Sequence, residues 1–194
     1  MQNNFYSVIG FIALIIHVII NFEFIGKPRI NLSKANKAYQ KYIYAVGTYY
    51  MADALWGIAN NYHHIKLLYI DTVFYYIAAV FSVVFLCKYV VAYLMLENIP
   101  GKIFNFLGSL FCIGQIIALF INHFVHIFFW IDNNGVYHVY AFRYIVLTIQ
   151  VILFFTVTLE SFITTLKSSG AKKRRHMTIC LFGFEMVVTA IVQT

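Results

Sequence analysis

The sequence has few charged residues and almost no proline. Only 11% of its 194 residues are charged and two are proline, whereas soluble domains are about a quarter charged. By contrast, 62% of the residues are hydrophobic and 19% are aromatic. A soluble domain of this length cannot bury so much apolar surface. The composition therefore excludes an ordinary soluble protein and predicts an all-α protein in a lipid bilayer.

Cysteine is also scarce, and no motif is built on it. Cys87, Cys112 and Cys180 lie in apolar runs without CxxC spacing, so we expect reduced thiols and no disulfide framework. Nucleophile elbow, phosphate-binding loop and kinase signatures are missing as well, so we expect no enzyme activity and no cofactor. The start of the chain has no basic residues and no cleavage site follows, which predicts a retained first span and no removed signal peptide.

Six apolar runs reach, or nearly reach, the length of about 20 residues that crosses the hydrocarbon core. The predicted spans are 5–25, 42–62, 67–96, 103–131, 139–166 and 177–193. Unpaired backbone amides are costly in lipid, so we expect all six to be helices despite the many Val, Ile and Tyr residues. The predicted fold is a polytopic transmembrane helical bundle in a single domain, 1–194, without a soluble output domain.

Basic residues alternate between the loops and predict the orientation. Loops one, three and five carry Lys27, Arg29, Lys34, Lys37 and Lys41, then Lys102 with Lys88 nearby, then Lys167, Lys172, Lys173, Arg174 and Arg175. The second loop has only Lys66. These clusters predict a plasma-membrane protein with cytoplasmic odd-numbered loops and the N-terminus outside. They also account for most of the +7 charge, so we expect lipid partners and no nucleic acid.

An outside N-terminus and six spans place both chain ends outside. We therefore expect the chain to be a fragment of a longer, seven-span module, or a truncated gene product. This expectation follows from the predicted topology alone.

Polar residues follow one face of several predicted spans. Asp53 lies near the middle of its span, where a carboxylate costs about 2.5–3.5 kcal/mol on insertion scales. Tyr49, Asp53, Trp56 and Asn60 share one helical face. Because its carboxylate is costly to place in lipid, we expect Asp53 to face the bundle interior and to find a polar partner there.

Three further spans repeat the pattern. Their aligned residues are Asp71, Tyr75, Ser82 and Tyr89; Gly108, Gln115, Asn122 and His126, with His123 close by; and Arg143 and Gln150. We predict an interhelical cavity that opens to the outside, with Asp53 near its floor and Arg143 paired with Asp71 or Asp132. Such polar faces also occur as simple packing contacts between helices, and aromatic residues near helix ends as interfacial belts.

Metal binding is poorly supported by the histidines. His123 and His126 are spaced i, i+3, so both can face one ion, but no complete ligand motif accompanies them and we expect no metal. The run from Asp132 to Gly135 has part of a calcium-loop pattern. Asn134-Gly135 is more simply interpreted as a tight turn.

Three stretches combine apolar surroundings with short polar motifs: YYMADALWGIANNYHHIKLLYIDTVFYYIAAVFSVVFLCKYVVAYL, INHFVHIFFWIDNNGVYHVYAFRYI and SSGAKKRRHMTICLFG. Together they resemble the N-terminal multi-span module of bacterial sensor proteins common in Firmicutes, over nearly the whole chain. The resemblance implies a cytoplasmic output domain after the module, often a GGDEF diguanylate cyclase and sometimes a histidine kinase. It implies motif positions at Asp53, Trp56, Gly57, Asp71, Thr72, Asp132, Gly135, Tyr137 and Arg143. Neither output domain is present in these residues, so we expect no cyclic di-GMP synthesis.

The leading hypothesis is therefore a sensory, signal-transducing membrane module. Its candidate ligand-sensing residues are Asp53, Trp56, Asn60, Asp71, Tyr75, Gln115, Asn122, His123, His126, Asp132 and Arg143, and its expected partner is a small extracytoplasmic ligand. The alternative is a small transporter or channel subunit, and a third hypothesis is a structural or accessory membrane protein without a ligand. A homodimer is compatible with each of these hypotheses.

Overall fold

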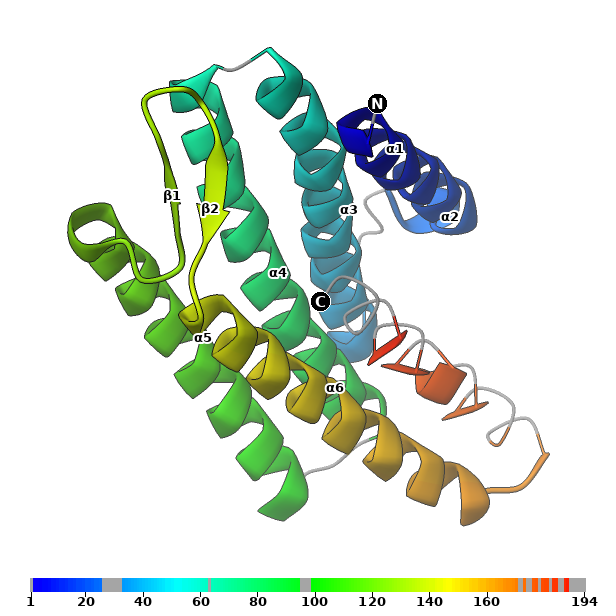
Figure 1. The fold of residues 1–194 in the computed structure, drawn as a ribbon. Helices are drawn as coiled ribbons and strands as arrows, with labels where there is room; N and C mark the ends of the chain where they lie inside the picture. The colour runs from blue at the N-terminus through cyan, green and yellow to red at the C-terminus, as the bar shows by residue number, and fades with distance from the viewer. Residues whose placement is uncertain are drawn as a thin grey trace.

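The protein is almost entirely helical. A computed structural model describes residues 2–25, 33–62, 64–94 and 99–170, and individual positions between 173 and 188. Figure 1 shows helices grouped around α4, with one β-hairpin beside the upper half of that helix. In chain order the elements are α1 (Gln2–Ile20), α2 (Phe22–Ile25), α3 (Lys34–Asn61), α4 (Ile65–Tyr93), α5 (Ile99–Val125), β1 (Phe129–Ile131), β2 (Tyr137–Val139) and α6 (Phe142–Leu166).

Within the described part of the chain, three helices are long and apolar enough to cross a membrane: α4, residues Gly101–Val125 of α5, and α6. Their outer faces expose large apolar side chains, such as Ile113 at 58% and Phe120 at 69%. Apolar surface this extensive is typical of contact with lipid. The finding supports membrane association. α3 lies outside this class because it is rich in polar residues. The apolar stretch Ser7–Ile20 of α1 lies outside it because it is shorter.

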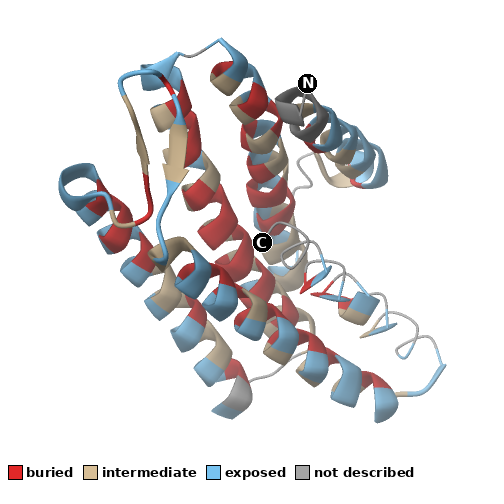
Figure 2. Cartoon of the chain, viewed as in Figure 1, coloured by how far each residue is buried: buried red, intermediate tan, exposed pale blue. Residues whose placement is uncertain are grey.

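The antiparallel pair of α3 and α4 forms the centre of the bundle. Figure 2 shows buried residues along nearly the full length of α4. On α3, the small residues Ala45, Ala52 and Ala59 are all buried and recur every seven residues. A seven-residue interval keeps them on one side of the helix, where small side chains let two backbones approach closely. This packing holds the polar face of α3 at a fixed position beside α4.

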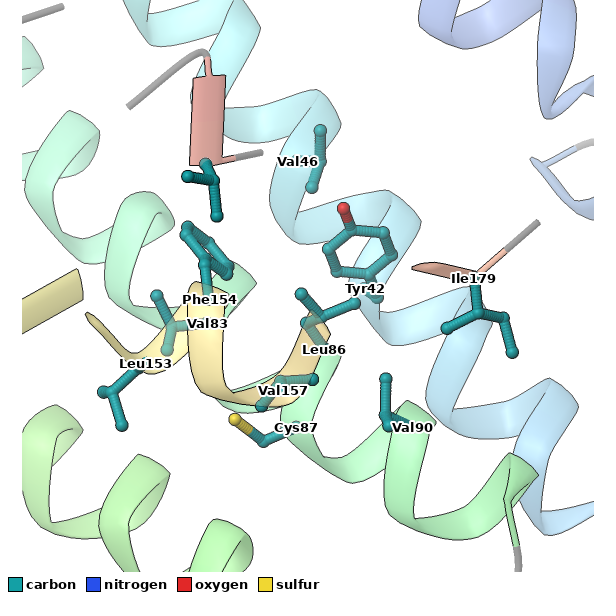
Figure 3. Packing of buried hydrophobic residues seen from close by; sticks show 11 residues of the cluster. Tyr42, Val46, Val83, Leu86, Cys87, Val90, Leu153, Phe154, Val157 and Ile179 are labelled. Carbon is teal, nitrogen blue, oxygen red and sulfur yellow. The ribbon is translucent and has the colours of Figure 1, made fainter. Parts of the chain in front are cut away.

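Two large hydrophobic clusters and a smaller one around Tyr49, Ala78 and Ala79 stabilise the described part of the bundle. The first joins α3, α4 and α6 and is seen in Figure 3, where Tyr42, Leu86 and Phe154 come from these three helices into one cluster. The second lies at the hairpin, where Phe128 and Phe129 are fully buried against Tyr76 of α4 and residues of α5. The hairpin is thus part of the packed interior, and its position is fixed by apolar contacts.

The connection between α5 and α6 is an antiparallel hairpin in which Phe129 pairs with Val139 and Ile131 with Tyr137. The predicted spans 103–131 and 139–166 are therefore wrong at these two ends, as is the expectation that every apolar run is helical. The helix stops before His126, whose φ of 48° lies in the left-handed region. Hydrogen bonds within the hairpin and to a side chain of α5 satisfy the backbone without a helix.

Other predicted boundaries also differ from the structure, whereas α4 lies within three residues of the predicted span 67–96 at both ends. The first predicted span, 5–25, is interrupted at Asn21, whose side chain donates to the His17 carbonyl and accepts from the Tyr39 hydroxyl. α3 begins at Lys34, eight residues before the predicted start at 42. The tight turn at Asn134-Gly135 is confirmed, with Gly135 at φ 78°. The sixth predicted span, 177–193, lies largely outside the described residues.

Candidate functional site

A cavity of about 300 Å³ lies between α3, α4, β2 and the start of α6. This volume is at the lower end of the usual range of small-molecule sites, about 300–1,000 Å³. Its lining combines one carboxylate, one guanidinium, one indole and three phenols. The lining residues are Asp53, Trp56, Thr72, Tyr75, Tyr76, Tyr137, Val139 and Arg143.

Tyrosines make the polar walls of the cavity. The hydroxyl of Tyr75 lies 3.2 Å from that of Tyr49, and the hydroxyl of Tyr76 lies 3.5 Å from that of Tyr137. Trp56 meets Tyr137 edge to face, with ring centroids 5.4 Å apart. Each phenol can donate or accept a hydrogen bond. The walls therefore offer hydrogen bonds and aromatic faces around the same volume.

Arg143 is the second residue of α6 and brings a cation to the cavity. Its Nε is buried and has no hydrogen-bond partner in the part of the chain that the structure describes. The groups that act on its charge are tyrosine hydroxyls, first among them those of Tyr76 and Tyr137. The predicted pairing with Asp71 or Asp132 is wrong, because the one ion pair among the described residues joins Asp132 to His138.

Two carboxylates lie near the opposite wall, on neighbouring helices. Asp53 of α3 lines the cavity, and Gly10 of α1 approaches its carboxylate closely. Asp71 of α4 is buried at 8% exposure, and its Oδ2 has no partner among the described residues. Asp71 does not line the cavity, but its charge interacts with that of Asp53. The site thus separates negative charge on α3 and α4 from positive charge on α6.

Asn122 and Gln115 support the site without lining it. Asn122 of α5 is fully buried, and its Oδ1 accepts from the backbone N–H groups of Phe128 and Phe129 while its Nδ2 donates to the Phe129 carbonyl. Gln115 donates from Nε2 to the Tyr76 carbonyl at 3.0 Å. These two predicted sensing residues therefore anchor the hairpin and α4, which makes their role structural.

The histidines lie away from the cavity. His123 contacts the Tyr69 hydroxyl through Nδ1 at 3.2 Å, and His126 is exposed beside Trp130. His138 stacks on Trp130. Among the described residues, no group of three or more metal-binding side chains comes together.

Asp132 shapes the hairpin turn. Its Oδ1 accepts from the backbone N–H groups of Asn134 and Val136, both at 2.9 Å, and its Oδ2 faces His138 Nε2 at 3.2 Å. The hydrogen bond from Val136 is the main reason why the pKa of Asp132 is lower than usual. Asp132 is therefore a turn-forming residue of the hairpin and does not line the cavity.

The sequence-based candidates thus divide into two groups. Asp53, Trp56, Tyr75 and Arg143 line one cavity. The other candidates, which lie outside the lining, are Asn60, Asp71, Gln115, Asn122, His123, His126 and Asp132. Tyr76 is a lining residue that sequence reasoning missed, because one tyrosine among 15 gives no distinguishing pattern. Tyr137 was indicated only by the family resemblance.

No protein-family model, curated protein or solved structure matches this chain. The chemistry of the site is therefore argued from its own residues.

Proposed function

We propose that this chain is a six-span sensory membrane module whose cavity binds a small zwitterionic ligand from the outside of the cell. The observation that carries the proposal is the presence of Asp53 and Arg143 in one cavity without an ion pair between them. A charged group held away from water is costly unless a partner of opposite charge is present. A ligand that carries both charges would supply the missing partner at each end.

The aromatic lining favours the same class of ligand. An ammonium group beside Asp53 would also lie near the Trp56 indole, the aromatic ring that attracts cations most strongly. An anionic group beside Arg143 would receive the forked guanidinium N–H donors, which match a carboxylate in geometry. The phenols of Tyr75 and Tyr76 would provide hydrogen bonds between these two ends. Amino acids and betaines have this arrangement of charges.

The position of the cavity supports an outward-facing site. Its residues gather toward the end of the bundle where α3 connects to α4 and where the hairpin lies (Figure 1). The loops at this end are the ones that are poor in Lys and Arg, which the positive-inside rule places outside the cell. The N-terminus is outside in the same topology.

The composition of the walls supports a sensory role. A ligand that contacts α3, α4 and α6 at once stabilises one arrangement of these helices over another, and only such differential affinity can shift a conformational equilibrium. The resemblance to the membrane modules of GGDEF diguanylate cyclases favours this role over that of a passive binding protein. The output would come from a domain that these residues do not contain.

Ligand binding is tested first, on the detergent-solubilised chain. The probes are proteinogenic amino acids and glycine betaine, each compared with N-acetylated or amidated analogues that lack one charge. We expect the zwitterions alone to raise the melting temperature, since a ligand at 100 times its Kd stabilises by about 2.7 kcal/mol. Stabilisation by the singly charged analogues alone would contradict a zwitterionic ligand, although it would still show that the protein has a binding site.

Variants assign the binding to the cavity. Asp53→Asn and Arg143→Lys are expected to weaken binding at least about tenfold, because each removes one charge or one forked donor from the site. His126→Gln, on an exposed residue away from the cavity, is the matched control and should bind normally. Equal loss in the control would indicate general destabilisation.

Signalling is tested in a fusion to a diguanylate cyclase domain. Asp53→Asn should leave membrane insertion unchanged and abolish the response of cyclic di-GMP to the ligand. Output that is identical in this variant and the parent fusion would refute the sensory role. The alternative, a small transporter or channel subunit, predicts flux of the same zwitterions into liposomes.

A further inference from the structure

A second cavity, of about 380 Å³, lies toward the starts of α3 and α5 and the end of α4, away from the hairpin. Four lysines line it, three from α3 and one from α4, and none of the described lining residues is acidic. The remaining lining residues are mostly apolar. The described lining residues are Lys34, Lys37, Ala38, Lys41, Phe85, Lys88, Val91, Ala92 and Asn105.

The N-terminus of α3 adds to the positive charge of the lysines. Lys34, Lys37 and Lys41 occupy the first turns of α3, and no acidic residue lies in the first turn. A helix N-terminus carries a partial positive charge of its own, so lysines at this position repel it and an anion is favoured. Among the described residues, none of the four lysines has a carboxylate within ion-pair distance.

Asn105 of α5 adds an unused hydrogen-bond acceptor. Its Oδ1 is buried and has no partner in the described part of the chain, although Asn105 lines the cavity. A buried acceptor without a donor is costly. A ligand that combines an anion for the lysines with a hydroxyl for Asn105 would satisfy both groups. Phe85 and Val91 then supply an apolar wall for a hydrocarbon portion.

We propose that this lysine cavity binds the headgroup of an anionic phospholipid that combines a phosphate with hydroxyls, as phosphatidylglycerol does. The phosphate lies among Lys37, Lys41 and Lys88, and a headgroup hydroxyl donates to Asn105 Oδ1. The acyl chains extend along the apolar surface of the neighbouring helices. The positive-inside rule puts these lysines at the cytoplasmic leaflet, where anionic lipids attract basic pockets between helices. The site is separate from the Asp53–Arg143 cavity and does not depend on it.

The test uses the full chain, delipidated in detergent, with bound lipid counted by native mass spectrometry. The probes are dioctanoyl phosphatidylglycerol, dioctanoyl phosphatidylcholine and inorganic phosphate. We expect saturable binding of phosphatidylglycerol and at least tenfold weaker binding of phosphatidylcholine. Equal binding of the two lipids would overturn the proposal. Displacement of the lipid by an equal concentration of inorganic phosphate would show that free phosphate is the ligand instead.

Two kinds of variant locate the binding. The pair Lys37→Gln and Lys88→Gln should weaken phosphatidylglycerol binding at least tenfold, whereas the pair Lys66→Gln and Lys167→Gln, which removes the same charge elsewhere, should not. Equal losses of affinity in both pairs would mean that the lipid is held by non-specific electrostatic attraction to the protein, which would overturn the proposed site. Asn105→Leu changes no charge and is expected to weaken binding about threefold to tenfold through the lost hydrogen bond. Unchanged binding in Asn105→Leu would refute the headgroup geometry.

Discussion

Replacement of Asn122 by alanine should release the hairpin that forms one wall of the zwitterion cavity. The Asn122 side chain satisfies the backbone N–H groups of Phe128 and Phe129 and the Phe129 carbonyl, and all three residues are fully buried. Leaving a buried group unpaired costs about 1–3 kcal/mol, so three such groups put the loss at about 3–5 kcal/mol once water reaches part of the opened site. The effect is local first, because within the described residues β1 and β2 pair with each other and with no further strand.

Hydrogen–deuterium exchange resolved by mass spectrometry measures this loss. In Asn122→Ala, the peptide that contains Phe128 and Phe129 should exchange several hundred times faster, whereas peptides from the middle of α4 should change little. Asn134→Ala is the control. Its side chain is exposed and its turn contact comes from the backbone, so its effect should stay within about 0.5 kcal/mol.

The outcome also bears on the cavity. Tyr137 and Val139 of β2 belong to its lining, so ligand binding should weaken in the same variant even though Asn122 does not touch the ligand. Exchange at Phe128 and Phe129 that matches the parent protein would refute the reasoning, since it would mean that the hairpin is held without this side chain.

Three other changes test separate features. Gly10→Ala should weaken the docking of α1 on α3, because a Cβ there would lie 2.8 Å from the backbone nitrogen of Ala54, and cysteine crosslinking of the two helices reports it. Gln115→Met should lower the melting temperature slightly, because it removes the hydrogen bond to the Tyr76 carbonyl, and the loss of the buried and unpaired Oε1 offsets only part of that cost. Asp132 has a pKa below its usual value, so its contribution to hairpin stability is present above the unfolded pKa of about 3.9 and is lost as pH falls through the folded value. Exchange of the hairpin amides should therefore accelerate only in strong acid, and Asp132→Ala should abolish that pH dependence.

The sequence predicted the all-helical class, and four of its candidate residues lie in the lining of one cavity, for physical reasons. Asp53, Trp56, Tyr75 and Arg143 were found because polar residues in apolar helices stand out and are costly. The hairpin was missed because its strands, Phe129–Ile131 and Tyr137–Val139, are too short and too apolar to be told from helix ends by periodicity.

The role of Asn122 could not be read from the chain either. A buried asparagine at a helical interval from Gln115 has the same pattern whether it faces a ligand or caps a neighbouring segment. Its partners are backbone groups of Phe128 and Phe129, six and seven residues later in the chain. These contacts can be recognised only when it is known that α5 ends before Phe128. The pairing of Arg143 failed for a related reason: Asp132 is engaged by its own turn and by His138.

The two proposed sites lie on the same helix, which suggests how a ligand could act at a distance. Lys41 and Asp53 are about 18 Å apart along α3 at 1.5 Å per residue. α3 packs extensively on α4, whereas α6 has much thinner contacts with α4 and α5. Elements with few packing contacts are the ones that move most readily. A ligand that draws Arg143 toward Asp53 should therefore shift α6 against a fixed α3–α4 pair anchored by lipid at its lysine end. An inter-helix distance from spin labels on α3 and α6 that stays the same with and without bound ligand would contradict this coupling.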